Sequence, residues 1–98
     1  MGKSFDLRMS ETRRMFILQA LKAAADYRAG TPIIGEFLLT MGFGCPHVAL
    51  RAELEWLRDE RLVTLDDIDE LLIARLTQAG LDVANGLQQI PGVRRMDP

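Results

Sequence analysis

The chain has 98 residues, with 12 Lys and Arg against 14 Asp and Glu, one His and one Cys. This length accommodates one domain, and a hydrophobic share of 48% is too high for a disordered chain. A formal charge of −2 argues against a protein that coats nucleic acid by bulk electrostatics, and a single Cys excludes an internal disulfide.

The first segments predict an extended arm followed by a helix. Residues 1–9 alternate apolar and polar side chains, as a short arm packed on the body would. Ser10 can act as an N-cap by accepting a backbone N–H. The helix is expected from Glu11 to about Ala25, because apolar residues recur there at helical spacing.

Two further helices follow, joined by a short glycine-rich turn. Thr31 can cap the second helix and Pro32 suits its first position, while Gly42 and Gly44 end it. The third helix is expected over about 46–60. Its inward stripe comprises Leu50, Leu54 and Leu57. A tight turn between two helices is typical of a helix-turn-helix, which presents the outer face of its second helix.

After Arg61 the helical spacing gives way to β-branched and apolar runs. Residues 63–65 and 71–76 flank the polar segment 66–70, and this pattern predicts a β-hairpin. Thr77 can then cap a fourth helix over about 78–85.

The element order predicts the fold class. Helix, helix, turn, helix, hairpin and helix together indicate a mainly α protein with a small β-hairpin (α+β), a winged helix-turn-helix in which the hairpin is the wing. We therefore divide the chain into an N-terminal arm (1–9), a winged-helix domain (10–86) and an extended, mobile C-terminal tail (87–98).

Three runs carry a resemblance to known regulators: Val48–Leu57, Arg61–Val63 and Leu76–Gly80. They resemble winged-helix regulators of the ArsR/MarR type, in which Gly-Leu-Val/Ile ends the third helix and Leu-Thr-x-x-Gly opens the last one. Arg61 stands where a glycine is usual. From Phe5 through Arg95, the chain also resembles small ArsR-like proteins of Mu-like transposable phages and prophages. The resemblance implies a phage-encoded regulator or DNA-handling accessory in the host cytoplasm.

The outer face of the third helix supplies candidate DNA contacts. In a DNA-binding winged helix this helix enters the major groove. Arg51 and Arg58 lie two turns apart on one face, and Arg can bond O6 and N7 of guanine. The candidates for contacts to double-stranded DNA are His47, Arg51, Glu55 and Arg58, with Thr31 near a phosphate. The alternative is an ordinary solvated helix face with Arg–Glu pairs.

The predicted wing carries the opposite charge. Asp66, Asp67, Asp69 and Glu70 would meet phosphates if the wing docked in the usual way, and like charges at an interface cost several kcal/mol. Either the wing stays off the DNA or its partner is a protein. The second functional hypothesis is therefore a protein-interaction module that keeps the winged-helix scaffold and does not bind DNA.

The terminal segments offer a candidate homodimer interface. Phe5–Met9 and Leu87–Met96 hold apolar residues outside the minimal fold, and packing within the monomer is the alternative. No membrane partner is expected, because strictly apolar runs such as Met15–Leu18 are far shorter than the roughly 18 residues of a membrane span.

Catalysis, metal binding and cofactors are not expected. The sequence Cys45-Pro46-His47 places a thiol near an imidazole, but an activated pair needs a third, orienting group, so we interpret Cys45 as a turn residue and keep redox sensing as the alternative. One Cys and one His are too few to hold zinc. The acidic wing lacks the glycine and the spacing of a calcium-binding loop.

Overall fold

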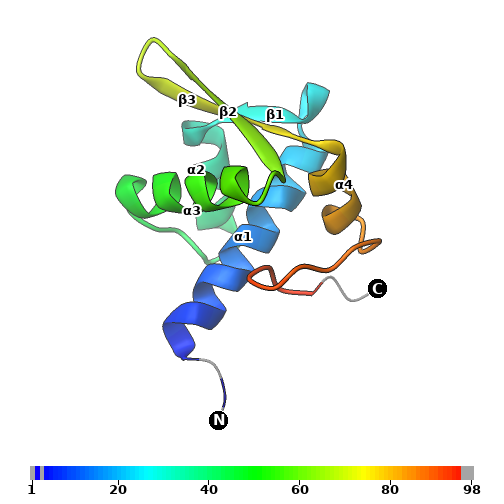
Figure 1. Cartoon of the computed structure of the whole chain (residues 1–98). Coiled ribbons are helices and arrows are strands. Elements are labelled where there is room, and N and C mark those ends of the chain that lie inside the picture. The colour runs from blue at the N-terminus through cyan, green and yellow to red at the C-terminus, as the bar shows by residue number, and fades with distance from the viewer. Residues whose placement is uncertain (1, 3, 96–98) are drawn as a thin grey trace.

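The computed structural model describes residue 2 and residues 4–95 of the chain. This part contains four α-helices and one small antiparallel sheet (Figure 1). In chain order the elements are α1 (Phe5–Ala23), the 3₁₀ turn η1 (Ala25–Tyr27), β1 (Arg28–Gly30), α2 (Thr31–Thr40), α3 (His47–Asp59), β2 (Val63–Ile68), β3 (Leu71–Leu76) and α4 (Gln78–Ala84). The protein is therefore mainly helical and of the α+β class. No described helix combines the length and apolarity needed to cross a bilayer.

α1 is the central helix and contacts the other three helices and the sheet. Ser4 caps it, because the Ser4 hydroxyl accepts the backbone N–H of Leu7 at 3.1 Å. The predictions of an extended arm up to residue 9 and of a cap at Ser10 are therefore wrong. Asp6 in the first turn suits the positive end of the helix, and this favours an earlier start than the alternation of side chains indicates.

α2 begins where the sequence predicts, although its cap differs. Gly30 is the N-cap and has no side chain that could accept a capping hydrogen bond. Thr31 is the first helical residue and not the cap. Pro32 lies in the first turn, where its missing N–H leaves no helical bond unmade. Gly42 then takes a left-handed φ of 82°, which turns the chain towards α3.

α3 confirms the predicted helix and its inward stripe. Leu50, Leu54 and Leu57 are all buried in one core with residues of α1, α2 and the sheet. The helix stops at Asp59 because Arg61 adopts a left-handed φ of 63°. A glycine usually adopts this conformation at the end of a helix. Arg61 replaces that glycine but keeps the left-handed backbone.

The sheet contains the predicted hairpin and one unpredicted strand. Its order is β1-β3-β2, with β2 and β3 paired in register from Val63↔Leu76 to Ile68↔Leu71. The turn is shorter than expected, since Asp66 and Asp67 belong to β2 and only two residues connect the strands. β1 has three residues that show no alternation, and only its pairing with β3 defines it as a strand.

The last helix matches its prediction, whereas the described part of the tail does not. The Thr77 hydroxyl accepts the backbone N–H of Gly80 at 3.0 Å and caps α4. Beyond α4 the chain packs back on α1: Val93 is buried, and the backbone N–H of Arg94 donates to the carbonyl of Glu11 at 3.1 Å. The tail is thus anchored through residue 94, and packing within the monomer holds for this stretch. Residues 96–98, with Met96 of the predicted dimer interface, lie outside the described residues.

The element order and the antiparallel pairing are compatible with the winged helix that the sequence predicts. α2 and α3 follow each other across a short turn, and the β2–β3 hairpin projects from the body beyond α3 (Figure 1). This arrangement places the exposed face of α3 and the hairpin on one side of the molecule.

Candidate functional site

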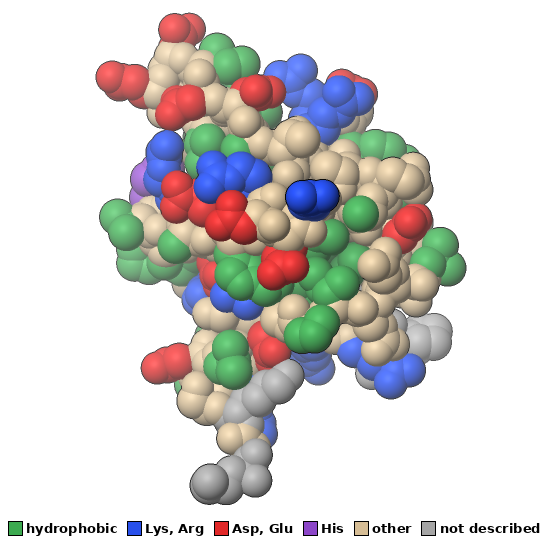
Figure 2. All heavy atoms as spheres, in the orientation of Figure 1, with side chains coloured by type: hydrophobic (Ala, Val, Ile, Leu, Met, Phe, Trp, Pro, Cys, Tyr) green, Lys and Arg blue, Asp and Glu red, His purple; other side chains and the backbone are tan. Residues whose placement is uncertain are grey.

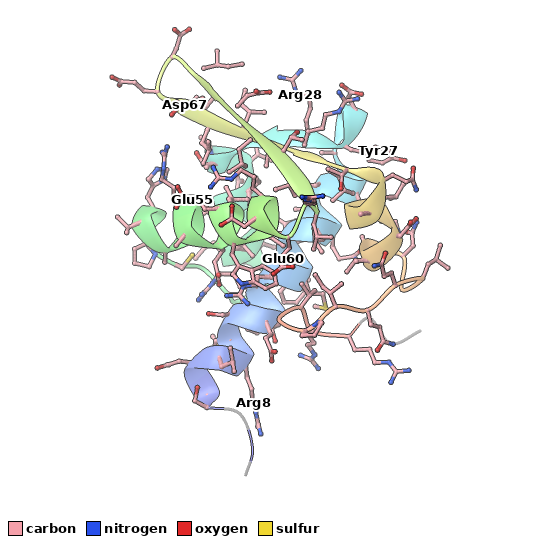
Figure 3. All side chains as sticks on the ribbon, viewed as in Figure 1. Arg8, Tyr27, Arg28, Glu55, Glu60 and Asp67 are labelled. Atoms are coloured by element: carbon pink, nitrogen blue, oxygen red, sulfur yellow. The ribbon has the colours of Figure 1, made fainter. Side chains whose placement is uncertain are left out.

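α3 presents its predicted outer face to solvent. His47, Glu55 and Arg58 are exposed, and Arg51 is partly exposed, while the leucines of the same helix fill the core. The hydrophobic stripe on the opposite side fixes this orientation. The four candidate side chains therefore lie where a partner could reach them. Glu55 is labelled on α3 in Figure 3.

Both candidate arginines on α3 have acidic partners. The Nη2 atom of Arg51 lies 3.3 Å from Oδ2 of Asp67 on β2, which joins the helix to the hairpin. Arg58 reaches Oδ1 of its neighbour Asp59, also at 3.3 Å. Such exposed pairs are worth about 0–1 kcal/mol each, so they compete with a partner without blocking it.

Thr31 differs from these exposed residues because it is buried. Its side chain is only 5% exposed, at the start of α2. Little of the hydroxyl remains for the predicted phosphate contact.

The hairpin gathers the four predicted acidic residues on an exposed surface. Asp66 and Asp67 lie on β2, and Asp69 and Glu70 form the turn, with left-handed φ values of 51° and 68°. All four are exposed, and Figure 2 shows acidic side chains spread over the hairpin. The hairpin thus holds four carboxylates at the projecting end of the molecule.

We call the exposed and partly exposed side chains of α3 and the hairpin, from His47 to Leu76, the α3–hairpin face. Its basic groups are Arg51, Arg58, Arg61 and Arg75, and its acidic groups are Glu55, Asp59, Glu60, Asp66, Asp67, Asp69 and Glu70. Four positive charges against seven negative ones leave −3 on this face. The face is therefore more acidic than the whole chain, whose formal charge is −2.

A buried ion cluster beneath α3 was not predicted. Glu53, 6% exposed, receives a hydrogen bond from Nε of Arg14 at 3.0 Å, and Arg13 lies 3.6 Å from its second carboxylate oxygen. Arg14 also stacks 4.0 Å from the centre of the Trp56 ring. Glu53 stands three residues after Leu50, so both side chains lie on the inward face of α3. This spacing was the signal in the sequence that Glu53 is buried.

The same arginine binds the C-terminal segment. Nη1 of Arg14 donates to the carbonyl of Gly92 at 2.9 Å, so one guanidinium connects α1, α3 and the tail. Charge-assisted bonds of this kind are stronger than neutral ones. The cluster therefore fixes how α3 sits on α1, and it anchors the end of the chain to the same place. Trp56 is partly buried and packs against the core.

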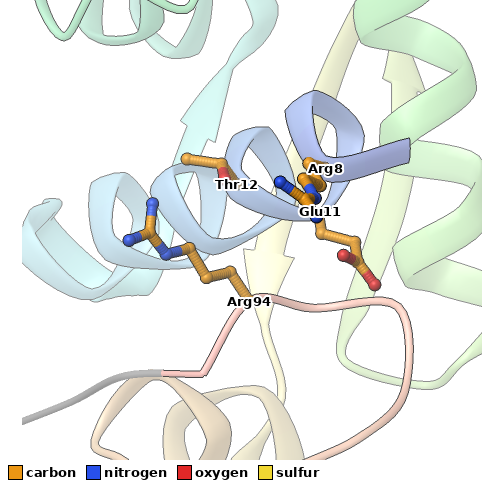
Figure 4. Close-up of a pocket in the computed structure, with 4 residues that line it drawn as sticks. All are labelled: Arg8, Glu11, Thr12 and Arg94. Atoms are coloured by element: carbon orange, nitrogen blue, oxygen red, sulfur yellow. The ribbon is translucent and has the colours of Figure 1, made fainter. Parts of the chain in front are cut away.

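A cavity of about 370 Å³ lies at the other end of the molecule (Figure 4). It is lined by Arg8, Glu11, Thr12 and Arg94. α1 supplies the first three residues and the anchored tail supplies the fourth, so the cavity depends on the tail contact. We call it the Arg8–Arg94 cavity. The sequence offered no signal for it, since Arg94 reaches α1 only through the fold of the tail.

Cys45 is partly buried between α2 and α3. Burial raises the pKa of the Cys45 thiol above its ordinary value; the Arg13 guanidinium opposes this rise and the Glu53 carboxylate adds to it. A thiol of this kind is a poor nucleophile at neutral pH. No group of three or more His, Cys, Asp or Glu side chains that could hold a metal ion occurs within residue 2 and residues 4–95.

The fold and this surface define a small α+β protein that projects an acidic hairpin beside an exposed helix. Its sequence is 30% identical over 90 residues to "Uncharacterized protein gp26" of Escherichia phage Mu, covering 92% of this chain and 93% of that protein. The chain belongs to the family of this phage Mu protein, which confirms the resemblance to small proteins of Mu-like phages. No family model matches the chain, and no solved structure matches it. The ArsR/MarR relationship stays a prediction.

Proposed function

We propose that this phage-related protein is a non-enzymatic interaction module on a winged-helix scaffold, and that its α3–hairpin face binds a basic protein surface. The observation that carries the proposal is the charge of −3 on that face. A winged helix that binds DNA places these same two elements against the phosphates.

Electrostatics favours a basic protein over DNA as the partner. Duplex DNA carries one negative charge per roughly 1.7 Å of its axis, and binding gains affinity by neutralising phosphates with Lys and Arg. The hairpin would instead bring the carboxylates of Asp66, Asp67, Asp69 and Glu70 towards them. Against a basic protein surface, the same carboxylates accelerate encounter and select the partner.

The pairing of the arginines adds to this preference. Arg51 and Arg58 each lie 3.3 Å from a carboxylate of the same chain. A contact to guanine would have to replace these ion pairs and would leave Asp67 and Asp59 beside the DNA. A basic partner can bind the carboxylates directly.

The rigidity of the scaffold supports recognition by a preformed surface. The bonds from Arg14 to Glu53 and to Gly92 hold α3, α1 and the tail together. Because the face is fixed before binding, little conformational entropy is lost on association.

Duplex DNA is the second candidate, with α3 as the recognition helix and the hairpin held away. One observation favours it: His47, Glu55 and Arg58 are exposed, and none of them packs in the core. Under this hypothesis, Arg51→Ala weakens DNA binding by about 1–3 kcal/mol.

An NMR titration distinguishes the two candidates. The ¹⁵N-labelled protein is titrated at low salt with a deca-arginine peptide and, separately, with a random duplex. We expect the peptide to shift amide signals of α3 and the hairpin, and the duplex to leave them unchanged. Shifts of α3 by the duplex, reduced by salt and weakened by Arg51→Ala, would overturn the proposal in favour of DNA.

A charge-matched pair of variants controls for net charge. Asp66→Lys with Glu70→Lys should abolish the peptide shifts, since both acidic residues are exposed on the hairpin. Glu36→Lys with Asp82→Lys makes the same change in charge outside the α3–hairpin face and should preserve them. Equal losses in the two variants would mean that the peptide responds to overall charge only, and the proposed face would then be rejected.

A further inference from the structure

Two arginines that lack an acidic partner in the described part of the chain line one cavity. Arg51, Arg58 and Arg75 all lie within 3.3 Å of a carboxylate. Arg8 and Arg94 have no such ion pair among residues 4–95, and both line the Arg8–Arg94 cavity (Figure 4). Its volume of about 370 Å³ is many times the roughly 30 Å³ share of one water molecule, so side chains can enter it.

Exposed apolar side chains lie beside this cavity on the same helix. Phe5 is 73% exposed and Leu7 is 42% exposed, three residues and one residue before Arg8 on the first turns of α1. Arginine combined with exposed aromatic and aliphatic residues is the composition of a protein-binding surface. With Glu11 in its lining, the cavity carries a net charge of +1, and Phe5 and Leu7 add exposed apolar side chains beside it.

The tip of the β2–β3 hairpin has the complementary composition. Asp69 and Glu70 form its turn, and Ile68 and Leu71 pair directly behind them. Ile68 is 47% exposed and Leu71 is 38% exposed. The tip thus joins negative charge to exposed apolar side chains on a narrow, projecting element.

The two surfaces lie at opposite ends of the molecule. The longest dimension is 44 Å, and Figure 1 shows the hairpin and the start of α1 at opposite ends of the view. The hairpin tip therefore does not reach the Arg8–Arg94 cavity of its own chain. A second copy can bring the two together.

We propose that the protein self-associates head to tail, with the hairpin tip of one copy bound in the Arg8–Arg94 cavity of the next. The carboxylates of Asp69 and Glu70 pair with the guanidinium groups of Arg8 and Arg94, and the flanking apolar residues pack together. Because the two surfaces differ, the contact is heterologous and builds a closed ring or an open chain. This inference rests on the proposed function and names a second copy as the basic partner of the acidic hairpin.

Reversing the charge of each surface tests the contact. The cavity variant carries Arg8→Glu and Arg94→Glu. The hairpin variant carries Asp69→Lys and Glu70→Lys, which changes both proposed contact residues and spares Asp67, the partner of Arg51. By light scattering at low salt, wild-type protein should exceed the monomer mass and approach it in 1 M salt, where the Debye length is about 3 Å. Each variant alone should be monomeric at low salt.

Mixing the two variants supplies the decisive measurement. The basic hairpin of one variant then fits the acidic cavity of the other, and the converse pair is also complementary. The equimolar mixture should therefore regain the mass that each variant loses. Lys22→Glu with Arg28→Glu, two exposed residues outside the cavity, matches the charge change of the cavity variant and should leave assembly intact.

Two results would overturn the inference: a wild-type protein that is monomeric at every concentration, or reversals that leave the mass unchanged. Circular dichroism of each variant verifies that it is folded. Adding sodium phosphate at constant ionic strength tests whether the cavity is instead a simple anion site. If phosphate shifts the NMR signals of Arg94 but leaves the molar mass from light scattering unchanged, self-association through the cavity is also rejected. If the wild-type protein is monomeric but still binds the deca-arginine peptide through the hairpin, this inference fails while the proposed function stands.

Discussion

Gly92 lies so close to the indole of Trp56 that a Cβ on Gly92 would stand 2.6 Å from Cη2 of the ring. The backbone there has a φ of +96°, and the Gly92 carbonyl accepts a bond from Arg14. The tail therefore depends on one glycine, on grounds of both space and backbone conformation.

Gly92→Ala should detach the tail and lower the free energy of unfolding by about 1–3 kcal/mol, because the new methyl group overlaps the ring and the left-handed backbone disfavours it. Urea unfolding followed by the fluorescence of the single Trp measures the loss. Gly42→Ala is the matched control, since Gly42 also has a left-handed φ (+82°) but has no atom within 4 Å of the added Cβ. Equal losses at the two sites would show that the contact with Trp56 is unimportant.

Glu53→Gln should destabilise the fold by about 3 kcal/mol or more. The change leaves Arg13 and Arg14, with side chains only 14% and 12% exposed, without the buried carboxylate that compensates their charge. Thermal unfolding and urea titration report the effect. Asp26→Asn removes one partner of the exposed pair with Arg75 and should cost at most about 1 kcal/mol. If the two variants lose similar stability, the buried cluster does not hold α3 as we infer.

Arg61→Gly should raise the free energy of unfolding by up to about 1 kcal/mol. Arg61 has a left-handed φ of 63°, which costs a side-chain-bearing residue more than it costs glycine. Arg61→Ala removes the same side chain, keeps the backbone penalty and should not stabilise. A gain in the alanine variant equal to that of the glycine variant would assign the effect to charge and not to backbone conformation.

Cys45 should react slowly with iodoacetamide in the folded protein at neutral pH, since burial raises the pKa of its thiol and keeps it protonated. The urea-unfolded chain should react faster, and the folded rate should rise only at more alkaline pH. The raised pKa also implies that the thiol supports folding below its unfolded pKa and loses this contribution as the pH rises through the folded value. Rapid modification of the folded protein at neutral pH would contradict this and revive redox sensing at Cys45.

The helices and the hairpin were predictable because each follows from local spacing. The leucine stripe of α3 and the cap at Thr77 are readable within a few residues of sequence, and the structure confirms both. The start of α1 was missed because the alternating residues before Ser10 resembled an extended strand, whereas Ser4 caps the helix. β1 was missed because only its pairing with β3 distinguishes it.

The candidate site was predictable in its residues but not in its pairings. The exposure of the outer face of α3 and the acidity of the hairpin follow from the sequence, whereas the bond between Arg51 and Asp67 requires the hairpin to lie beside the helix. The Arg8–Arg94 cavity joins the start of α1 to residue 94 and is a product of tertiary structure alone. Contacts between residues so far apart in the chain leave no periodic signal.

The bond from Arg14 to the carbonyl of Gly92 joins residues 78 positions apart, and the contact of Glu11 with Arg94 closes a loop of similar span. Both bonds form only after residue 94 has been synthesised and has left the ribosome. Until then, Arg14 and Trp56 lack the segment that covers them, so a nascent or stalled chain has neither a closed cavity nor its final stability. The self-association that we propose through the Arg8–Arg94 cavity therefore requires a chain synthesised through residue 94.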